Sequence, residues 1–259
     1  NGVSSGGITG TPQSLPAGWI LQGGYLIGPA ANLTNATLID TNLTNANLTG
    51  ANLTNAILAG ANLFGVISGE ISGTPQSLPA GWIVQGGFLI GPGANLNNLN
   101  LDGVDLTNAN LSGASLANLD LTYANLTTAN LTNANLTNTN LTGVSLGFKD
   151  LTGVNLTGAN LTGADLGGSD LTGALLNNAI LTEAILEDTN LTNADLTGAD
   201  VTGAQVTGTT LTGANLTGAT LTGVMSHTVI GTPTALPAGW IVQGGFLIGP
   251  GAVPVPVAG

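Results

Sequence analysis

Leucine, or a close substitute, recurs at every fifth position over most of this chain. The series runs from Leu33 to Leu63 and again from Leu96 to Leu221, and its only substitutes are Val201 and Val206. A period of five matches neither an α-helix, at about 3.6, nor a β-strand, at about 2. The chain must therefore turn a corner once per repeat. We predict a solenoid in which each repeat forms one side of a coil.

The residues around each leucine are also regular. Stretches such as Ala159-Asn160-Leu161-Thr162-Gly163 resemble the pentapeptide-repeat family, whose repeat is a small residue, Asp or Asn, Leu or Phe, a small polar residue and a variable one. The resemblance implies an all-β fold, a right-handed quadrilateral β-helix with four repeats per coil. Leu161 would then point inward and stack on the leucines twenty residues away, with Ala159 filling the remaining interior. Gly and Asn near the corners suit tight turns.

A second motif interrupts the leucine series and occurs three times. It runs from Gly10 to Pro29, from Gly73 to Pro92 and from Gly231 to Pro250, and it contains every tryptophan of the chain. In the second copy, two short apolar runs between Trp82 and Ile90 flank a Gly-Gly pair, which predicts a β-hairpin. Pro75, Pro79 and Pro92 bracket this hairpin and are expected to prevent the ladder from simply continuing through it.

These patterns predict two unequal solenoid blocks with three hairpin modules. A solenoid must cover its first and last coils, and a hairpin that carries Trp and Phe is suited to that task. The expected parts are an N-terminal hairpin module at 1–31, a short repeat block at 32–65, a second module at 66–94, the main β-helix at 95–224, and a C-terminal module with a Pro-Val tail at 225–259.

The third module is followed by no further leucine series, and two interpretations stay open. In the first, it docks on a neighbouring copy of the chain, so that subunits join head to tail into an open filament. In the second, it folds back over the last coil of its own chain. The residues predicted to form the joint are Trp240, Ile241, Val242, Phe246, Leu247 and Ile248 from the third module, and Trp19, Tyr25 and Leu26 from the first coil.

Composition excludes several classes of protein. The chain has one Lys or Arg against 13 acidic residues and a formal net charge of −12, so nucleic acid is not an expected partner. No apolar run approaches the roughly 20 residues of a membrane span. Cysteine is absent, so neither disulfides nor thiolate metal sites are expected. Low charge with abundant Thr and Asn favours an exported protein at the cell surface or outside the cell, where sequons such as Asn130-Leu131-Thr132 could accept glycans.

Residues for catalysis, cofactors or metals are scarce, and we expect none of these sites. His227 is the only histidine and has no acidic neighbour in sequence, so it is interpreted as a solvated linker residue. Glu183, Glu187 and Asp188 form the densest acidic group. A weak calcium site there is conceivable, but a solvated face is the preferred interpretation.

Lys149 stands two positions before a leucine, where a small inward residue is usual. A buried ammonium group is costly unless it is paired. We therefore expect its side chain to reach outward, or the coil to bulge at Gly147 and Phe148, with Asp150 or another acidic residue as partner. An interface salt bridge or a covalent crosslink is the alternative.

The primary prediction is a non-enzymatic structural protein that assembles with itself into an extracellular filament, sheath or surface layer. Two alternatives follow from the outward residues. Aspartates precede several leucines, as at Asp165 and Asp170, and some family members are DNA mimics that bind DNA gyrase, although Asn occupies this position more often here. Threonine follows most leucines, as at Thr162, and threonine arrays occur in ice-binding solenoids.

Overall fold

The computed structural model describes residues 3–101 and 104–254 of the chain. Within these residues it contains short strands and no helix, so no helix is available that could cross a membrane. The chain divides into two compact units. Unit 1 contains Asn1–Leu99 and Ala109–Ser115, and unit 2 contains Asn100–Asn108 and Leu116–Gly259.

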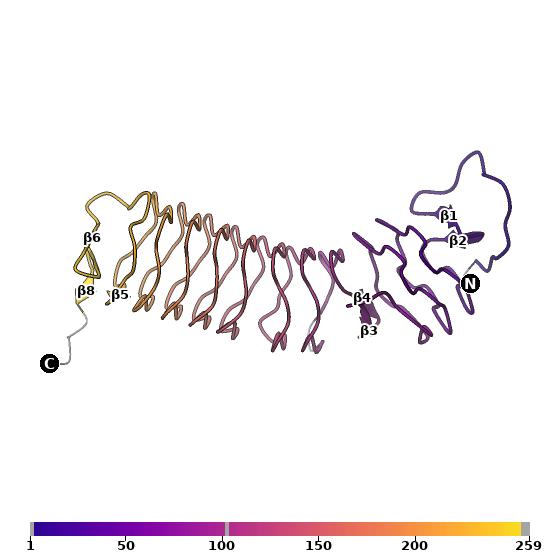
Figure 1. Cartoon of the computed structure of the whole chain (residues 1–259), viewed down its shortest axis with the longest axis horizontal. Helices are drawn as coiled ribbons and strands as arrows, with labels where there is room; N and C mark the ends of the chain where they lie inside the picture. Colours follow the sequence, from indigo (N-terminus) through magenta and orange to yellow (C-terminus); the bar gives the residue numbers. More distant parts are fainter. Residues whose placement is uncertain (1–2, 102–103, 255–259) are drawn as a thin grey trace. The chain divides into compact units, whose positions relative to one another are not determined.

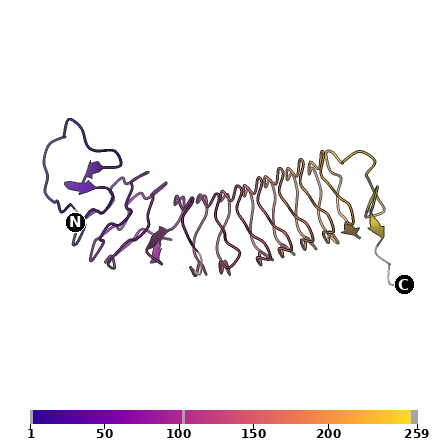
Figure 2. The ribbon, with the colours of Figure 1, turned by 180° about the vertical axis from the view of Figure 1, so that it is seen from behind.

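In both units, parallel bridges join residues that are twenty positions apart. Asn32 pairs with Asn52 in unit 1, and Asn140 pairs with Asn160 in unit 2. Because each repeat has five residues, four repeats close one coil, and each coil stacks in parallel on the one before it. Figures 1 and 2 show the successive coils of unit 2 from opposite sides. The coil predicted from the five-residue period is therefore present.

The interior of the coils is filled by alternating leucine and alanine. Leu161 and Ala159 are fully buried, and so are Leu141 and Leu181, which lie one coil before and one coil after. Full burial of a leucine side chain stabilises a fold by about 1.5–3 kcal/mol. The predicted inward ladder of large and small residues is confirmed, and it takes the place of a globular core.

The corners between the sides of a coil use left-handed backbone angles. Asn133 has φ 56° and Gly153, one coil further on, has φ 65°. This region costs residues with a Cβ atom about 1–2 kcal/mol, and Asn and Gly tolerate it best. A Cβ atom on Gly153 would also overlap the Oδ1 atom of Asn133. Glycine therefore fits the corner at Gly153 without displacing the Asn133 side chain one coil before it.

The Asn or Asp before each leucine anchors the turn that follows. Asn160 Oδ1 accepts hydrogen bonds from the backbone N–H of Thr162 at 3.1 Å and from its hydroxyl at 2.7 Å. Asp195 accepts the equivalent pair from Thr197, at 3.0 and 2.5 Å. Such local bonds fix a turn without a backbone partner. The outward threonine rows therefore serve the geometry of the repeat itself.

Each copy of the second motif contains an antiparallel hairpin. The three pairs are β1 (Ile20–Gln22) with β2 (Tyr25–Ile27), β3 (Ile83–Gln85) with β4 (Phe88–Ile90), and β6 (Ile241–Gln243) with β7 (Phe246–Ile248). In the second copy, Gly86 and Gly87 form the turn with φ 57° and 81°. Two successive positive φ values are the requirement of a type I′ hairpin turn, which glycine meets without strain.

The hairpins are insertions into enlarged coils. The bridge across the first module joins Ser4 to Asn32, and the bridge across the second joins Ile67 to Asn95. In the third module, β5 (Met225–Ser226) pairs in parallel with β8 (Val253–Pro254). Each bridge spans twenty-eight positions, eight more than an ordinary coil, and the hairpin takes up the difference. The modules are thus coils of the stack that carry an added hairpin.

The ladder continues through part of the second module before the hairpin is inserted. Asn52 pairs with Ser72 and Ile57 pairs with Ser77, and the Leu58 N–H donates to the Ser77 carbonyl at 3.0 Å. Pro75 falls between these two rungs, so its missing N–H group removes no ladder bond. The coil therefore continues as far as Ser77, with serines in place of the outward Asn, and the ladder resumes at Asn95 after the hairpin.

Candidate functional site

The third module folds onto its own chain. Thr210 pairs with Ile230 and Asn215 pairs with Ala235, and the Gly223 N–H donates to the Gly251 carbonyl at 2.7 Å. The hypothesis that this module docks on a neighbouring chain in place of its own is therefore wrong. The alternative, in which it covers the preceding coil of its own chain, describes the structure.

The residues predicted for the joint differ in exposure. In the third module, Trp240 and Leu247 are buried, whereas Ile241 and Ile248 are 51% and 45% exposed. The remaining predicted residues, which are Val242, Phe246, Trp19, Tyr25 and Leu26, are half-buried. Trp240 is covered within its own module, because a Cβ atom on Gly249 would overlap its ring. Ile241 and Ile248 are thus the most exposed side chains of this set.

Two copies of the module have the same sequence in different surroundings. The segment from Leu78 to Ala94 is identical to the segment from Leu236 to Ala252. Ile90 is 0% exposed in the second copy, whereas its equivalent Ile248 is 45% exposed. In the second copy the following coil covers the module, and the Leu96 N–H donates to the Ser115 carbonyl at 2.8 Å. We call this side of a module its exit face; in the third copy it is defined by Ile248, Gly251 and Val253.

The first copy of the module is more exposed than the other two on its opposite side, which faces away from the coil that follows it. Ile8 is 38% exposed, whereas its equivalents Ile71 and Val229 are 8% and 7% exposed. The second and third copies each pack on a preceding coil. No preceding coil packs on the first copy among the described residues. The uncovered side contains an apolar hollow of about 340 Å³. We call this side the entry face, and the apolar side chains that line its hollow are Ile8, Pro12, Leu15, Leu21 and Leu26.

A second candidate site lies in unit 2, between two successive coils whose parallel bridges are interrupted on part of the coil surface. No backbone hydrogen bond joins residues 123–131 to residues 142–150 in the described chain. The rungs on either side are intact, since Asp120 pairs with Asn140 and Asn135 pairs with Asn155. We call this gap in the ladder the wall opening. It coincides with a pocket of about 600 Å³ that is lined by residues of both edges.

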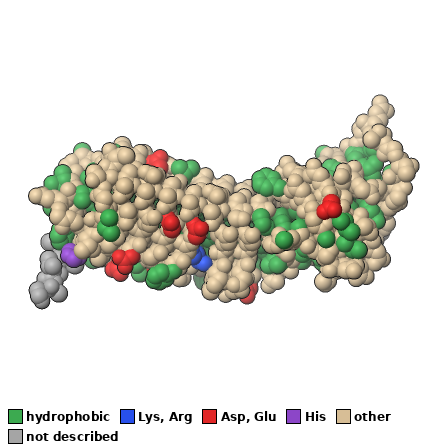
Figure 3. Space-filling view, in the orientation of Figure 1, with side chains coloured by type: hydrophobic (Ala, Val, Ile, Leu, Met, Phe, Trp, Pro, Cys, Tyr) green, Lys and Arg blue, Asp and Glu red, His purple; other side chains and the backbone are tan. Residues whose placement is uncertain are grey.

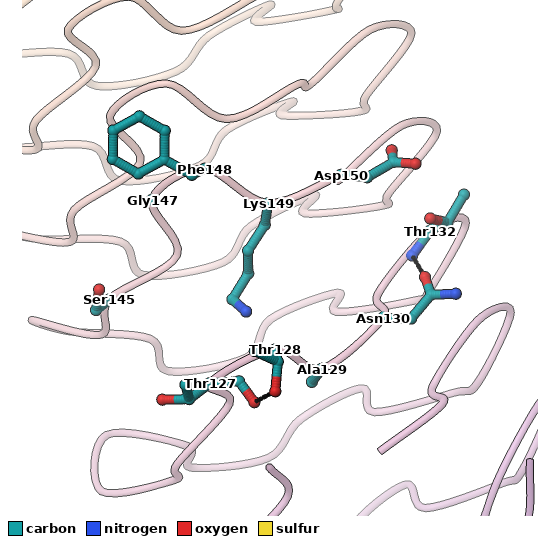
Figure 4. A pocket seen from close by; sticks show the side chains of 10 residues that line it. All are labelled: Thr127, Thr128, Ala129, Asn130, Thr132, Ser145, Gly147, Phe148, Lys149 and Asp150. Carbon is teal, nitrogen blue, oxygen red and sulfur yellow. Dashed lines mark hydrogen bonds between the residues drawn. The ribbon is translucent and has the colours of Figure 1, made fainter. Parts of the chain in front are cut away.

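Lys149 crosses the wall opening. Its Nζ atom donates to the Leu126 carbonyl at 2.7 Å, and Figure 4 shows the side chain extended toward the segment that contains Thr128 and Ala129. Desolvation by burial lowers the pKa of Lys149. The prediction that Asp150 pairs with Lys149 is wrong. The Asp150 side chain points away from the ammonium group (Figure 4) and accepts a hydrogen bond from the Thr152 N–H at 3.0 Å.

His227 lies edge-on to Phe246, with ring centroids 5.2 Å apart. In the described part of the chain, no group of three or more His, Cys, Asp or Glu side chains could hold a metal ion. On the face shown in Figure 3, the acidic side chains form separate spots and no continuous stripe.

The fold defined by these observations is a parallel β-solenoid with four-sided coils. A family model described as pentapeptide repeats matches the chain in eight copies, over residues 31–67, 93–118, 109–147, 150–188, 169–204 and 189–224. Together these stretches make up well over half of the sequence. The chain therefore belongs to the pentapeptide-repeat family, whose members form right-handed quadrilateral β-helices and are in general non-catalytic structural or binding proteins.

Solved structures of the family resemble this one. HetL, a pentapeptide repeat protein involved in heterocyst differentiation regulation in the cyanobacterium Nostoc, is 28% identical with a TM-score of 0.47, covering 74% of this chain and 86% of HetL. A pentapeptide repeat protein from the Arabidopsis thaliana thylakoid lumen is 29% identical with a TM-score of 0.38, covering 38% of this chain and 69% of that one. At these TM-scores the superpositions carry no functional argument.

A plasmid-mediated fluoroquinolone resistance protein, QnrB1, is also similar. It is 17% identical with a TM-score of 0.34, and the match covers 76% of this chain and 75% of QnrB1. This likeness is too distant to transfer a partner. A comparison with curated proteins gave no significant match.

Proposed function

We propose that this protein is a non-catalytic structural solenoid that stacks end to end on other copies of itself. The observation that carries the proposal is the difference between the identical segments of the second and third modules. Where a coil follows, Ile90 is fully buried; where none follows among the described residues, Ile248 is 45% exposed. The exit face of the third module thus has the surface that elsewhere in the molecule receives another coil.

The entry face of the first module supplies the complementary surface. In the second and third copies, the same face rests on a coil of this chain, as the pairing of Ile57 with Ser77 and of Thr210 with Ile230 shows. The residues that line the hollow of the first copy carry no charge, and neither do Ile248, Gly251 and Val253. Burying one isoleucine fully contributes about 1.5–3 kcal/mol. Both faces therefore fit a further coil of this kind, and we propose that a second copy of the chain provides it.

End-on contacts of this kind join two different surfaces, so they continue from subunit to subunit unless the rotation closes a ring. We propose that the product is an open filament, sheath or surface layer, located outside the cell. The location rests on the sequence, which has abundant Thr and Asn and only one Lys or Arg. Protease treatment of intact cells of the source organism would test it, since an external protein is digested while a cytosolic control is spared.

Sedimentation velocity over a range of protein concentrations tests the association. The wild-type protein is expected to grow in average mass as concentration rises, whereas Ile248→Asp should remain at the mass of one chain. Ile180→Asp is the matched control, because Ile180 is 41% exposed on the side of a coil and should associate like the wild type. A wild-type protein that stays monomeric at millimolar concentration would disprove the proposal.

The two alternative functions have less support. Ice binding needs free threonine hydroxyls, but those of Thr162 and Thr192 donate to the preceding asparagine at 2.7 and 2.6 Å. Gyrase binding by DNA mimicry needs a continuous acidic face, and the face drawn in Figure 3 shows separate acidic spots instead. A supercoiling assay with micromolar protein would revive the gyrase alternative if it showed inhibition.

A further inference from the structure

The wall opening is the one place in the described chain where a wide pocket and the single lysine coincide. Elsewhere in the same column of inward positions, small hydroxyl side chains occur. The Thr189 hydroxyl donates to the Leu166 carbonyl at 2.8 Å, and the Thr209 hydroxyl donates to the Leu186 carbonyl at 2.7 Å. Lys149 makes the same bond, to the carbonyl 23 positions before it, at 2.7 Å.

The longer side chain spreads the coils. From ordinary bond lengths, an extended lysine reaches roughly 4 Å further than a threonine hydroxyl. Neighbouring strands of a sheet lie about 4.8 Å apart. Because the ammonium group and the hydroxyls reach equivalent carbonyls at equal distances, the backbone at Lys149 lies farther from Leu126 than the backbone at Thr189 lies from Leu166. Near Lys149 the two edges of the opening are therefore farther apart than neighbouring coils are at Thr189 and Thr209.

The edges of the opening supply the chemistry of a sheet edge. Two hydrogen bonds of the regular ladder are not formed here. They are the bond from the Leu126 N–H to the Ser145 carbonyl and the bond from the Leu131 N–H to the Asp150 carbonyl. Such groups need partners, and an added extended peptide satisfies them in the manner of β-strand addition. Lys149 adds a positive charge, and one of its three N–H donors is used on Leu126. A carboxylate of the incoming segment would pair with the remaining donors.

We propose that the wall opening binds an extended acidic peptide segment, which pairs with residues 123–131 and 142–150 as an additional rung and places a carboxylate on Lys149. Thr127, Thr128 and Ser145 also line the pocket, so the site suits polar rather than bulky apolar neighbours of the acidic residue. The pocket volume of about 600 Å³ lies within the range of about 300–1,000 Å³ of ligand pockets.

Amide hydrogen exchange with short probe peptides tests the proposal. Acetyl-Thr-Glu-Thr-amide at saturating concentration should slow exchange in 123–131 and 142–150 at least ten-fold in the wild-type protein. Acetyl-Thr-Gln-Thr-amide, which has the same shape without the charge, should protect the same amides several-fold less. Equal protection by the two peptides, or no protection by either, would overturn the proposal, and so would equal protection by sodium acetate alone, which would indicate a site for small anions only.

Two substitutions of Lys149 distinguish the contribution of the gap between the coils from the contribution of the positive charge. Lys149→Thr matches Thr189 and Thr209, so it should close the wall, protect these amides without peptide and abolish the effect of the peptide. Lys149→Met keeps a long side chain without charge and should respond equally to the two peptides. Melting curves verify that both variants fold. Peptide protection of Lys149→Thr that matches the wild type would contradict the proposed site.

Discussion

The second and third modules contain the same run of residues in two different environments. From Leu78 to Ala94 and from Leu236 to Ala252 every residue agrees, yet Ile90 is buried and Ile248 is not. The local structure is unchanged, since Ile83 pairs with Ile90 just as Ile241 pairs with Ile248. The hairpin is therefore determined by its own sequence, whereas burial of its exit face depends on whether another coil follows.

This comparison shows what limits stability in a solenoid. Each coil contacts only its neighbours, so the stability of one coil depends on its own residues and on the interfaces above and below it. A substitution at an inner interface must disturb two coils, and the same substitution at an outer face disturbs one. The pairs of substitutions that follow use this difference.

The largest effect is expected from a charge at the exit face. Ile90→Asp places a carboxylate between two coils and should destabilise the protein by about 3–5 kcal/mol, because it removes a packed side chain and buries a charge. Ile248→Asp should change stability by about 0.5 kcal/mol or less. Thermal or urea unfolding of monomeric samples measures both. Equal losses of stability would show that the two faces are equally packed.

A smaller effect is expected where glycine makes room for tryptophan. A Cβ atom on Gly91 or on Gly249 would overlap the ring of Trp82 or Trp240. Gly91→Ala should destabilise by about 1–3 kcal/mol, as overpacking does. Gly249→Ala should cost less, since no following coil restrains the third module within the described residues. The shift in melting temperature reports both values, and a larger shift for Gly249→Ala would contradict this explanation.

The threonine rows should contribute about 0.5–1.5 kcal/mol per hydrogen bond. Thr162→Val removes the hydroxyl that donates to Asn160 and should lower stability by that amount. Thr222→Val is the control, because the residue two positions before it is Thr220, which has no carboxamide. Urea unfolding compares the two variants. A neutral Thr162→Val would mean that the row has another role.

The smallest expected effect is a loss of folding stability at low pH. Hydrogen bonds from Thr197 and Thr202 lower the pKa of Asp195 and Asp200 in the folded protein. A lowered folded-state pKa adds stability above the unfolded value of about 3.9, and that stability is lost as pH falls through the folded pKa. Unfolding measured between pH 6 and pH 2 should show this loss below about pH 4, and replacing both residues with Asn should reduce it. A pH dependence that is unchanged in the double variant would contradict the assignment.

Much of the coil could be predicted from the sequence, because the leucine period determines it. Leu161 and Ala159 lie where the repeat predicts. The path through the second module could not be predicted, since Ser72 and Ser77 continue the ladder without the leucine pattern. Lys149 was recognisable as unusual, but its partner is a backbone carbonyl, and a sequence does not show which carbonyl an inward side chain will reach. The exposure of Ile248 was likewise hidden, because it depends on a neighbouring coil.

The most direct test of end-on stacking uses two variants that each block one face. Ile8→Asp alters the entry face and Ile248→Asp alters the exit face, so each variant alone should sediment as a single chain. An equimolar mixture should form dimers and nothing longer, because one unaltered entry face then meets one unaltered exit face. A mixture that stays monomeric, or dimers in either variant alone, would contradict the account.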